Sequence, residues 1–160
     1  MCTRPDPVVF DRIRVFLYHL DAAKNWALLP LYIVATAEIG ASSGDAATIS
    51  QLLNRAAEII ALTGSRWCEA EVTRLRARYC ARDAEESLAM LRSSLATARR
   101  QRAKLWELRA AADMARLLRD RDDHDGAREA LLPVYGSFSE GSEIPDLVTA
   151  RTLIDGLRPH

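Results

Sequence analysis

Apolar residues recur at intervals of three and four positions along most of this chain. Three sets show the spacing most clearly: Cys68, Val72, Leu75 and Tyr79; Leu88, Leu91, Leu95 and Ala98; and Leu147, Ala150, Ile154 and Leu157. Such spacing places the apolar side chains of each set on one face of an α-helix. No run of alternating β-branched residues competes with it. The pattern predicts an all-α fold.

Breaks in the apolar pattern predict where the helices begin and end. Gly64 ends one helix and Ser65 is placed to cap the next, while Asp83 followed by Glu86 resembles a capping box. Pro145 suits a first helical turn. We therefore predict helices at residues 7–22, 26–40, 46–62, 66–81, 84–101, 104–120, 124–136 and 145–157.

Small residues recur at similar separations within successive helix pairs. Ala37 and Ala56 are 19 residues apart, Ala115 and Val134 are 19 apart, and Ala77 and Ser94 are 17 apart. Helices that cross closely need small side chains at the contact, because a large one forces the backbones apart. The spacing predicts one domain over residues 1–160 with three helical hairpins, at about 26–62, 66–101 and 104–136.

Composition and charge exclude several classes of function. The 22 basic and 22 acidic residues give no net charge, which argues against a nucleic-acid-binding or membrane-binding protein. The sequence has no phosphate-binding loop, no nucleophile elbow and no Cys-x-x-Cys pair. We therefore expect no enzyme activity, no cofactor and no metal. Three unpaired cysteines and the lack of a signal peptide favour the cytoplasm.

The hairpins with small residues at their crossings resemble tetratricopeptide repeats. The second half carries a more specific resemblance, in GSRWCEAEVTRLRARY (64–79), SSLATARRQRAKLWELRAAADMARLLRD (93–120) and AREALLPVYGSFSEGSEIPDLVTARTLIDGL (127–157). These segments look like the C-terminal helical repeats of large bacterial proteins that join a class III adenylate or guanylate cyclase domain, or a DNA-binding domain, to an ATPase module. In that family the array ends close to P-V-Y-G-W-F-T-E-G-F-D-T-P-D-L, which residues 133–147 match at ten positions.

The resemblance implies a short right-handed solenoid of seven to eight helices. Residues 145–157 would form its C-terminal capping helix, and residues 7–22 would belong to an incomplete preceding repeat. The chain departs from the family motif at Ser137, Ser142 and Ile144, and the last replaces a Thr that caps the final helix. None of the residues of the cyclase or ATPase modules is present in this sequence, so their activities are not carried over.

Two rows of arginines suggest a site for a partner. Nine basic residues lie between Arg74 and Lys104, interrupted by only three acids. If the repeat register holds, the first helices of the hairpins line a concave groove, and six arginines project into it: Arg74, Arg78, Arg82, Arg109, Arg116 and Arg119. Such a groove would bind an acidic peptide or a carboxylate terminus through bidentate contacts. The alternative is a solvated surface that reflects a bias toward arginine.

The sequence therefore predicts a non-enzymatic module for protein–protein interaction. The first predicted helix carries a stripe of apolar residues that would favour docking or self-association: Phe10, Ile13, Phe16, Leu17 and Leu20. A sensor of small ligands and an inactive remnant of a split multidomain regulator are the alternatives.

Overall fold

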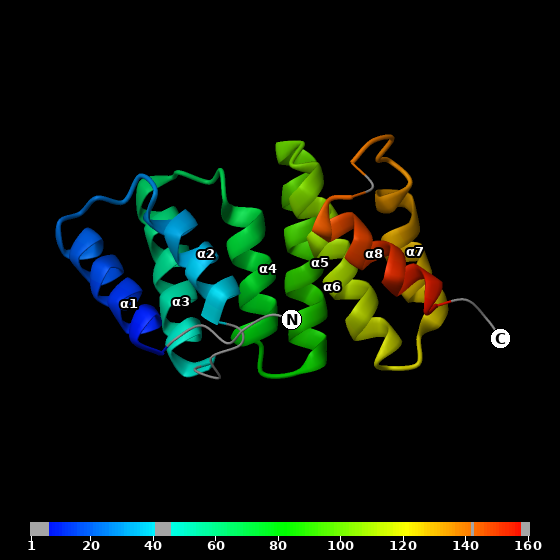
Figure 1. Cartoon of the computed structure of the whole chain (residues 1–160), viewed down its shortest axis with the longest axis horizontal. Helices are drawn as coiled ribbons and strands as arrows, with labels where there is room; N and C mark the ends of the chain where they lie inside the picture. The colour runs from blue at the N-terminus through cyan, green and yellow to red at the C-terminus, as the bar shows by residue number, and fades with distance from the viewer. Residues whose placement is uncertain (1–6, 41–45, 142, 158–160) are drawn as a thin grey trace. The chain divides into compact units, whose positions relative to one another are not determined.

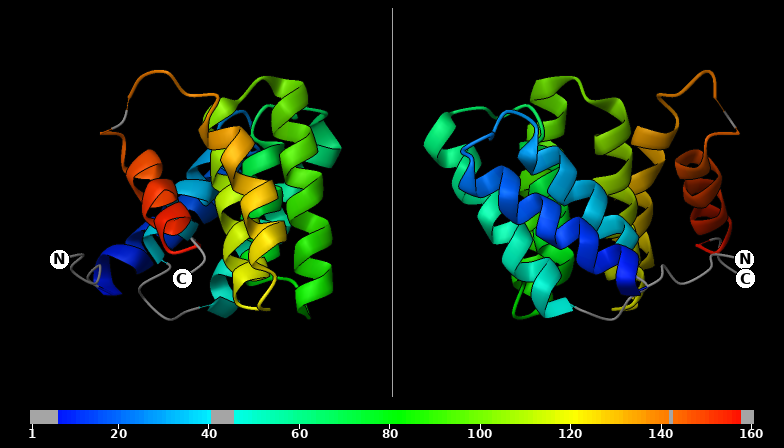
Figure 2. Two further views of the ribbon diagram at one scale, coloured as in Figure 1. Left: turned by 90° about the vertical axis from the view of Figure 1, so that its right-hand side faces the viewer. Right: turned by 60° about the vertical axis from the view of Figure 1, so that its left-hand side comes forward.

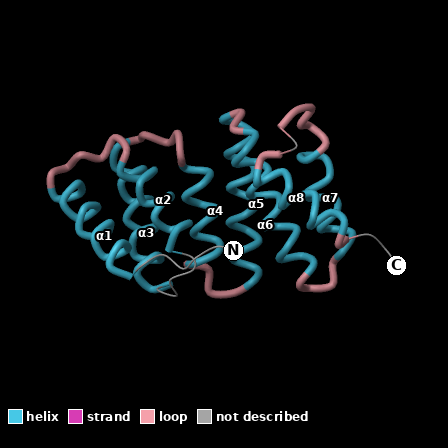
Figure 3. Tube along the Cα trace, in the orientation of Figure 1, coloured by secondary structure: helices cyan, strands magenta, loops and turns pink. Residues whose placement is uncertain are grey.

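In the described part of the computed structural model, every regular element is an α-helix (Figure 3). The description covers residues 7–40, 46–141 and 143–157. These ranges contain eight helices: α1 (Pro7–Ala22), α2 (Leu29–Gly40), α3 (Ala46–Thr63), α4 (Glu69–Tyr79), α5 (Ala84–Gln101), α6 (Lys104–Arg119), α7 (His124–Tyr135) and α8 (Pro145–Asp155). The prediction of an all-α fold is confirmed, and helix ends differ from the predicted ones by at most three residues. Within the described ranges no helix is both long and apolar enough to span a bilayer.

The chain divides into two compact units, Met1–Cys80 and Ala81–His160. In unit 1, α2 packs against α1, α3 and α4, and α3 also packs against α4 (Figure 1). In unit 2, α6 packs against α5, α7 and α8, and α7 also packs against α8. Packing between successive helices is thus a feature of each unit. The hairpin predicted over residues 66–101 would pair α4 of unit 1 with α5 of unit 2. This hairpin and the predicted solenoid therefore stay predictions.

The signals that begin and end helices act as predicted at several positions and fail at one. Gly64 follows α3 with a φ of +70°, a left-handed conformation that glycine adopts without strain. Asp83 caps α5, because its carboxylate accepts a hydrogen bond from the amide of Glu86. The prediction that Ser65 caps the next helix is wrong. α4 begins at Glu69, and its N-cap is Cys68, which makes no side-chain capping bond.

The core of unit 1 joins large aliphatic residues to small ones. Leu29 and Ile33 of α2 and Leu53 of α3 are almost fully buried, together with the predicted small residues Ala37 and Ala56. The small residues permit the close packing of α2 on α3, and the aliphatic ones fill the space beside that contact.

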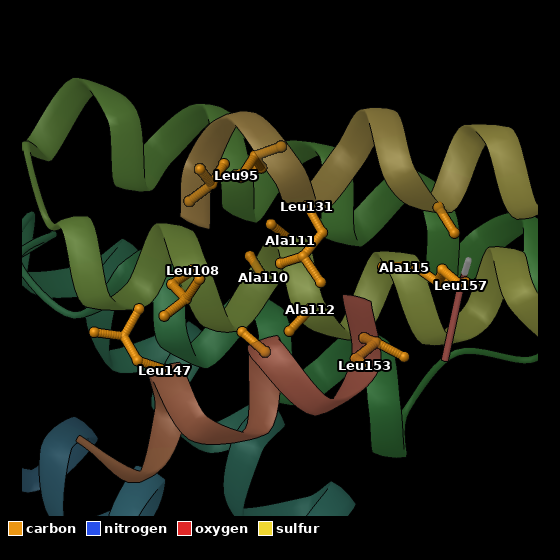
Figure 4. Close-up of a cluster of buried hydrophobic side chains, with 13 residues drawn as sticks. Leu95, Leu108, Ala110, Ala111, Ala112, Ala115, Leu131, Leu147, Leu153 and Leu157 are labelled. Atoms are coloured by element: carbon orange, nitrogen blue, oxygen red, sulfur yellow. The ribbon is translucent and has the colours of Figure 1, made fainter. Parts of the chain in front are cut away.

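The core of unit 2 is built around an alanine-rich part of α6 that is buried on more than one side (Figure 4). Ala110, Ala111, Ala112 and Ala115 of α6 are buried in one cluster with residues from α5, α7 and α8. Tyr135 and Phe138 pack at the edge of the same cluster as partly buried side chains. Three helices can approach α6 because alanine keeps its surface close to the backbone.

Candidate functional site

Arg74 lies in a buried ionic cluster between α4 and α2. Its guanidinium donates to both carboxylate oxygens of Glu71, at 2.9 and 2.8 Å, and to Glu38 Oε1 at 2.7 Å. Arg74 is 4% exposed and Glu71 is 1% exposed. A buried charge needs such partners, because transfer out of water is costly for an unpaired ion. The charge of Arg74 is therefore already matched within unit 1.

Arg78 and Arg82 are the exposed members of the first predicted row. The Arg78 guanidinium lies over the Tyr79 ring, 5.6 Å from the ring centroid. Arg82 lies beyond α4, which ends at Tyr79, so it does not share a helix with Arg74 and Arg78. It belongs to unit 2, where its Nε donates to Glu86 Oε2 at 3.0 Å.

The second predicted row lies on α6 in unit 2 and pairs with nearby acids. Arg109 makes two bonds of 3.0 Å to Asp146 at the start of α8, which ties α8 to α6. Arg116 pairs with Asp113 at 2.5 Å, and Arg119 pairs with Asp120 at 2.8 Å. Five of the six predicted arginines thus have a carboxylate partner in this chain. Their role in binding an acidic partner stays a prediction.

A cleft of about 490 Å³ opens in unit 1, and the sequence patterns did not point to it. α1 and α3 both pack on α2, as the ribbons show (Figure 2, right), and side chains from all three helices line the cleft, with α1 and α3 supplying its two walls. The lining is largely apolar and includes Leu17 of α1, Leu29 and Ile33 of α2, and Leu52 of α3. Tyr18 of α1 and Gln51 of α3 add hydrogen-bonding groups to the two walls.

An ion pair between α1 and α3 forms a polar end to the cleft. Arg55 Nε donates to Asp21 Oδ2 at 2.6 Å, and Arg55 Nη2 donates to Asp21 Oδ1 at 2.9 Å. The Trp26 indole N–H donates to the same carboxylate at 2.8 Å, and the Arg55 guanidinium lies 5.8 Å from the Trp26 ring centroid. The hydrogen bonds from Arg55 hold the pKa of Asp21 below its ordinary value, so this carboxylate is charged at neutral pH. Trp26 therefore helps to join α1 to α3 at this end.

Cys68 is a buried thiol at the start of α4. Burial raises the pKa of the Cys68 thiol to about 11, which keeps it protonated and unreactive near neutral pH. Among residues 7–40, 46–141 and 143–157, no group of three or more His, Cys, Asp or Glu side chains is arranged to hold a metal ion. The cleft is thus the feature most suited to binding another molecule.

Comparisons with known proteins leave the family open. No family model, no curated protein and no solved structure matches the chain. The resemblance to the tetratricopeptide arrays of cyclase–ATPase proteins therefore rests on the motifs of residues 64–157 alone. The structure and the comparisons together support an all-helical protein whose helices pack against their neighbours.

Proposed function

We propose that this chain is a protein–protein interaction module that binds an amphipathic helix of a partner in the cleft of unit 1. The observation that carries the proposal is the cleft itself, a largely apolar depression between α1 and α3 with α2 as its floor. Helix-in-groove recognition uses a surface of this kind, because the apolar face of an amphipathic helix replaces water over the floor.

The charges around the cleft narrow the chemistry of the partner. Two Asp–Arg pairs lie along it, Asp11 with Arg14 and Asp21 with Arg55, so its lining carries equal numbers of both signs. We expect a partner helix with apolar residues at helical spacing and mixed charges at its flanks, rather than a uniformly acidic or basic segment.

The proposal is tested by blocking the cleft without altering the rest of α3. Gln51 is exposed and lines the cleft, so Gln51→Trp would fill it, whereas Ala61→Trp places the same ring on an exposed site of α3 outside it. Helical peptides would be selected from a display library against the whole chain and their dissociation constants measured by fluorescence anisotropy. We expect Gln51→Trp to weaken binding by about tenfold or more, and Ala61→Trp to leave it unchanged. Equal binding to both variants would refute the cleft as the site.

An acidic partner bound by arginines remains a further part of the proposal. Arg78 and Arg82 are the residues that test it best, because both are exposed, whereas loss of Arg74 would disturb the buried cluster with Glu71. Alanine at Arg78 or Arg82 should weaken the binding of an acidic peptide library, and the loss should shrink at high salt. Unchanged affinity in both variants would favour the interpretation of these arginines as a solvated surface.

A sensor of small ligands is the second candidate, and the size of the cleft favours it. Sites for small molecules commonly have volumes of about 300–1,000 Å³, apolar linings and a few polar groups, and this cleft of about 490 Å³ fits that description. A thermal-shift screen with nucleotides and metabolites separates the two functions. A ligand that raises the melting temperature of the unaltered chain, but not that of Gln51→Trp, would favour the sensor.

The finer architecture and the location are also parts of this proposal. A right-handed tetratricopeptide-like solenoid is supported by the motif of residues 133–147 and by the buried small residues at the predicted crossings. A detached tail or inactive remnant of a cyclase–ATPase regulator would share that architecture and a cytoplasmic location. Small-angle X-ray scattering of the whole chain tests the solenoid, because its curvature gives a characteristic distribution of interatomic distances.

A further inference from the structure

The solvent-facing side of α1 carries a row of seven exposed residues, which we call the α1 stripe: Val8, Asp11, Arg12, Val15, Tyr18, His19 and Ala22. Val8 is 55% exposed, Val15 57% and Tyr18 71%. The opposite side of α1, with Phe10 and Leu17, is buried in unit 1. Large apolar side chains so exposed on one face of a 16-residue helix indicate a surface that another molecule covers.

The α1 stripe is symmetric in position about Val15. Seven residues separate Val15 from Val8 and from Ala22, four separate it from Asp11 and from His19, and three separate it from Arg12 and from Tyr18. An antiparallel copy of the helix therefore brings the members of each pair together. Apolar Val8 meets Ala22, the Asp11 carboxylate meets the hydrogen-bonding imidazole of His19, and the cation Arg12 meets the aromatic ring of Tyr18.

We propose that two copies of this chain associate through antiparallel α1 helices, with the twofold axis at Val15. Each of these contacts then occurs twice, as an isologous interface requires. A parallel pairing in register would instead place Asp11 beside Asp11 and Arg12 beside Arg12, and like charges repel at such distances. The proposal goes beyond the function argued above, because it needs no molecule other than a second copy.

The contacts that stripe residues make within their own helix leave them able to meet a second copy. Asp11 bonds Arg14 at 3.2 Å in an exposed pair, and His19 lies against Tyr18 with the ring centroids 5.9 Å apart. Exposed pairs of this kind cost little to rearrange. The charges of the α1 stripe therefore remain accessible from solvent.

The length of α1 sets the strength of this association. Sixteen residues with a rise of about 1.5 Å each give a helix about 24 Å long. The surface area buried between two such helices is therefore at the low end of the range found in protein–protein interfaces. We expect a dissociation constant of micromolar order or weaker. Asp11, Val15 and Tyr18 also line the cleft, so occupation of the cleft and self-association compete.

Sedimentation equilibrium of the whole chain, from about 10 μM to about 1 mM, tests the proposal. Val15→Glu places two carboxylates on the twofold axis and should weaken association by at least about tenfold. Val148→Glu is the matched control, because Val148 is 48% exposed on α8 and lies outside the α1 stripe. Circular dichroism of each variant reports whether the helices are retained. A chain that stays monomeric throughout, or an equal loss in both variants, overturns the proposal.

A charge exchange tests the antiparallel register itself. His19→Asp sets Asp11 against a second carboxylate at both ends and should weaken association by about tenfold. Adding Asp11→His restores a pair of one carboxylate and one imidazole, with their positions exchanged, and association should recover. Equal association of the single and double variants would exclude this register. His19 does not line the cleft, so a normal affinity of His19→Asp for a cleft peptide separates this result from the proposed function.

Discussion

Unit 1 and unit 2 each contain four helices in their described parts, yet they bury their surfaces in different ways. Unit 2 packs three helices around the alanine-rich part of α6, and four large apolar residues are exposed in its described part. Unit 1 keeps a cleft between α1 and α3, encloses an ionic cluster, and exposes ten large apolar residues in its described part. The difference shows that unit 2 is closely packed, whereas unit 1 leaves more apolar surface exposed to solvent in its described part.

The largest expected effect comes from breaking the ionic cluster of unit 1. Arg74→Met leaves Glu71 buried without its cation, and we expect it to lower the free energy of unfolding of unit 1 by about 3–5 kcal/mol. Urea denaturation followed by tryptophan fluorescence measures this. Trp26 and Trp67 report on unit 1 and Trp106 on unit 2, so the loss is assigned by comparing variants that keep one reporter.

The double variant Glu71→Met with Arg74→Met is the control for that experiment. Apolar residues of similar volume often replace a buried ion pair at little cost. The double variant should therefore recover most of the stability that Arg74→Met loses. A double variant as unstable as the single one would show that the geometry of the cluster, rather than an unpaired charge, governs the stability of unit 1.

The small-residue packing of unit 2 is expected to give the next largest effect. Ala111 is fully buried on α6, so Ala111→Leu forces neighbouring helices apart and should cost about 1–3 kcal/mol. Ala96→Leu adds the same atoms at an exposed position of α5 and should be close to neutral. Both variants are measured by urea denaturation. Similar free energies of unfolding would contradict the conclusion that unit 2 depends on close packing of small residues around α6.

Alkaline pH should weaken unit 1 through a buried thiol. Because burial raises the pKa of Cys68 to about 11, the folded unit keeps this thiol protonated while the unfolded chain ionises it near the ordinary value of 9.0. The protonated Cys68 thiol therefore makes its full contribution to the free energy of unfolding of unit 1 below about pH 9, and that contribution is lost as the pH rises toward 11. The stability should fall by at most about 1.4 kcal/mol per pH unit over that window. Cys68→Ala should remove this part of the slope in urea titrations.

The smallest expected effect concerns the polar end of the cleft. The pKa of Asp21 is lowered chiefly by hydrogen bonds from Arg55. The ionised carboxylate therefore stabilises unit 1 at pH values above the ordinary pKa of 3.8, and this stabilisation is lost as the pH falls below that value. Asp21→Asn should cost unit 1 about 0.5–1 kcal/mol at pH 7, since both side chains are partly exposed. The difference from the unaltered chain should shrink in acid titrations as the pH falls below the ordinary value of 3.8. Asp11→Asn, in a more exposed pair, should cost less.

The sequence predicted the helices well because the relevant information is local. The apolar spacing of three and four lies within each helix, and residues that end or cap a helix, such as Gly64 and Asp83, lie at its ends. Small residues such as Ala37 and Ala115 were expected at buried positions, and both are buried.

The partners of the arginines could not be predicted in the same way. Glu38 is 36 residues from Arg74, and Asp146 is 37 from Arg109. Such pairs depend on how one helix is rotated against another, which apolar spacing does not determine. The cleft could not be predicted for a related reason. It depends on how α1 and α3 both pack on α2, and no sequence motif encodes that arrangement.

The position of α6 within unit 2 has a consequence for the speed of folding. α6 packs against the helices that precede and follow it along the chain, and among the described helices of unit 2 only α8 joins it from further away. Loops that close between neighbouring helices cost little entropy, and domains dominated by such local pairings fold in microseconds to milliseconds. Unit 2 is therefore expected to form α5, α6 and α7 rapidly and to add α8 in its final step, when Arg109 reaches Asp146.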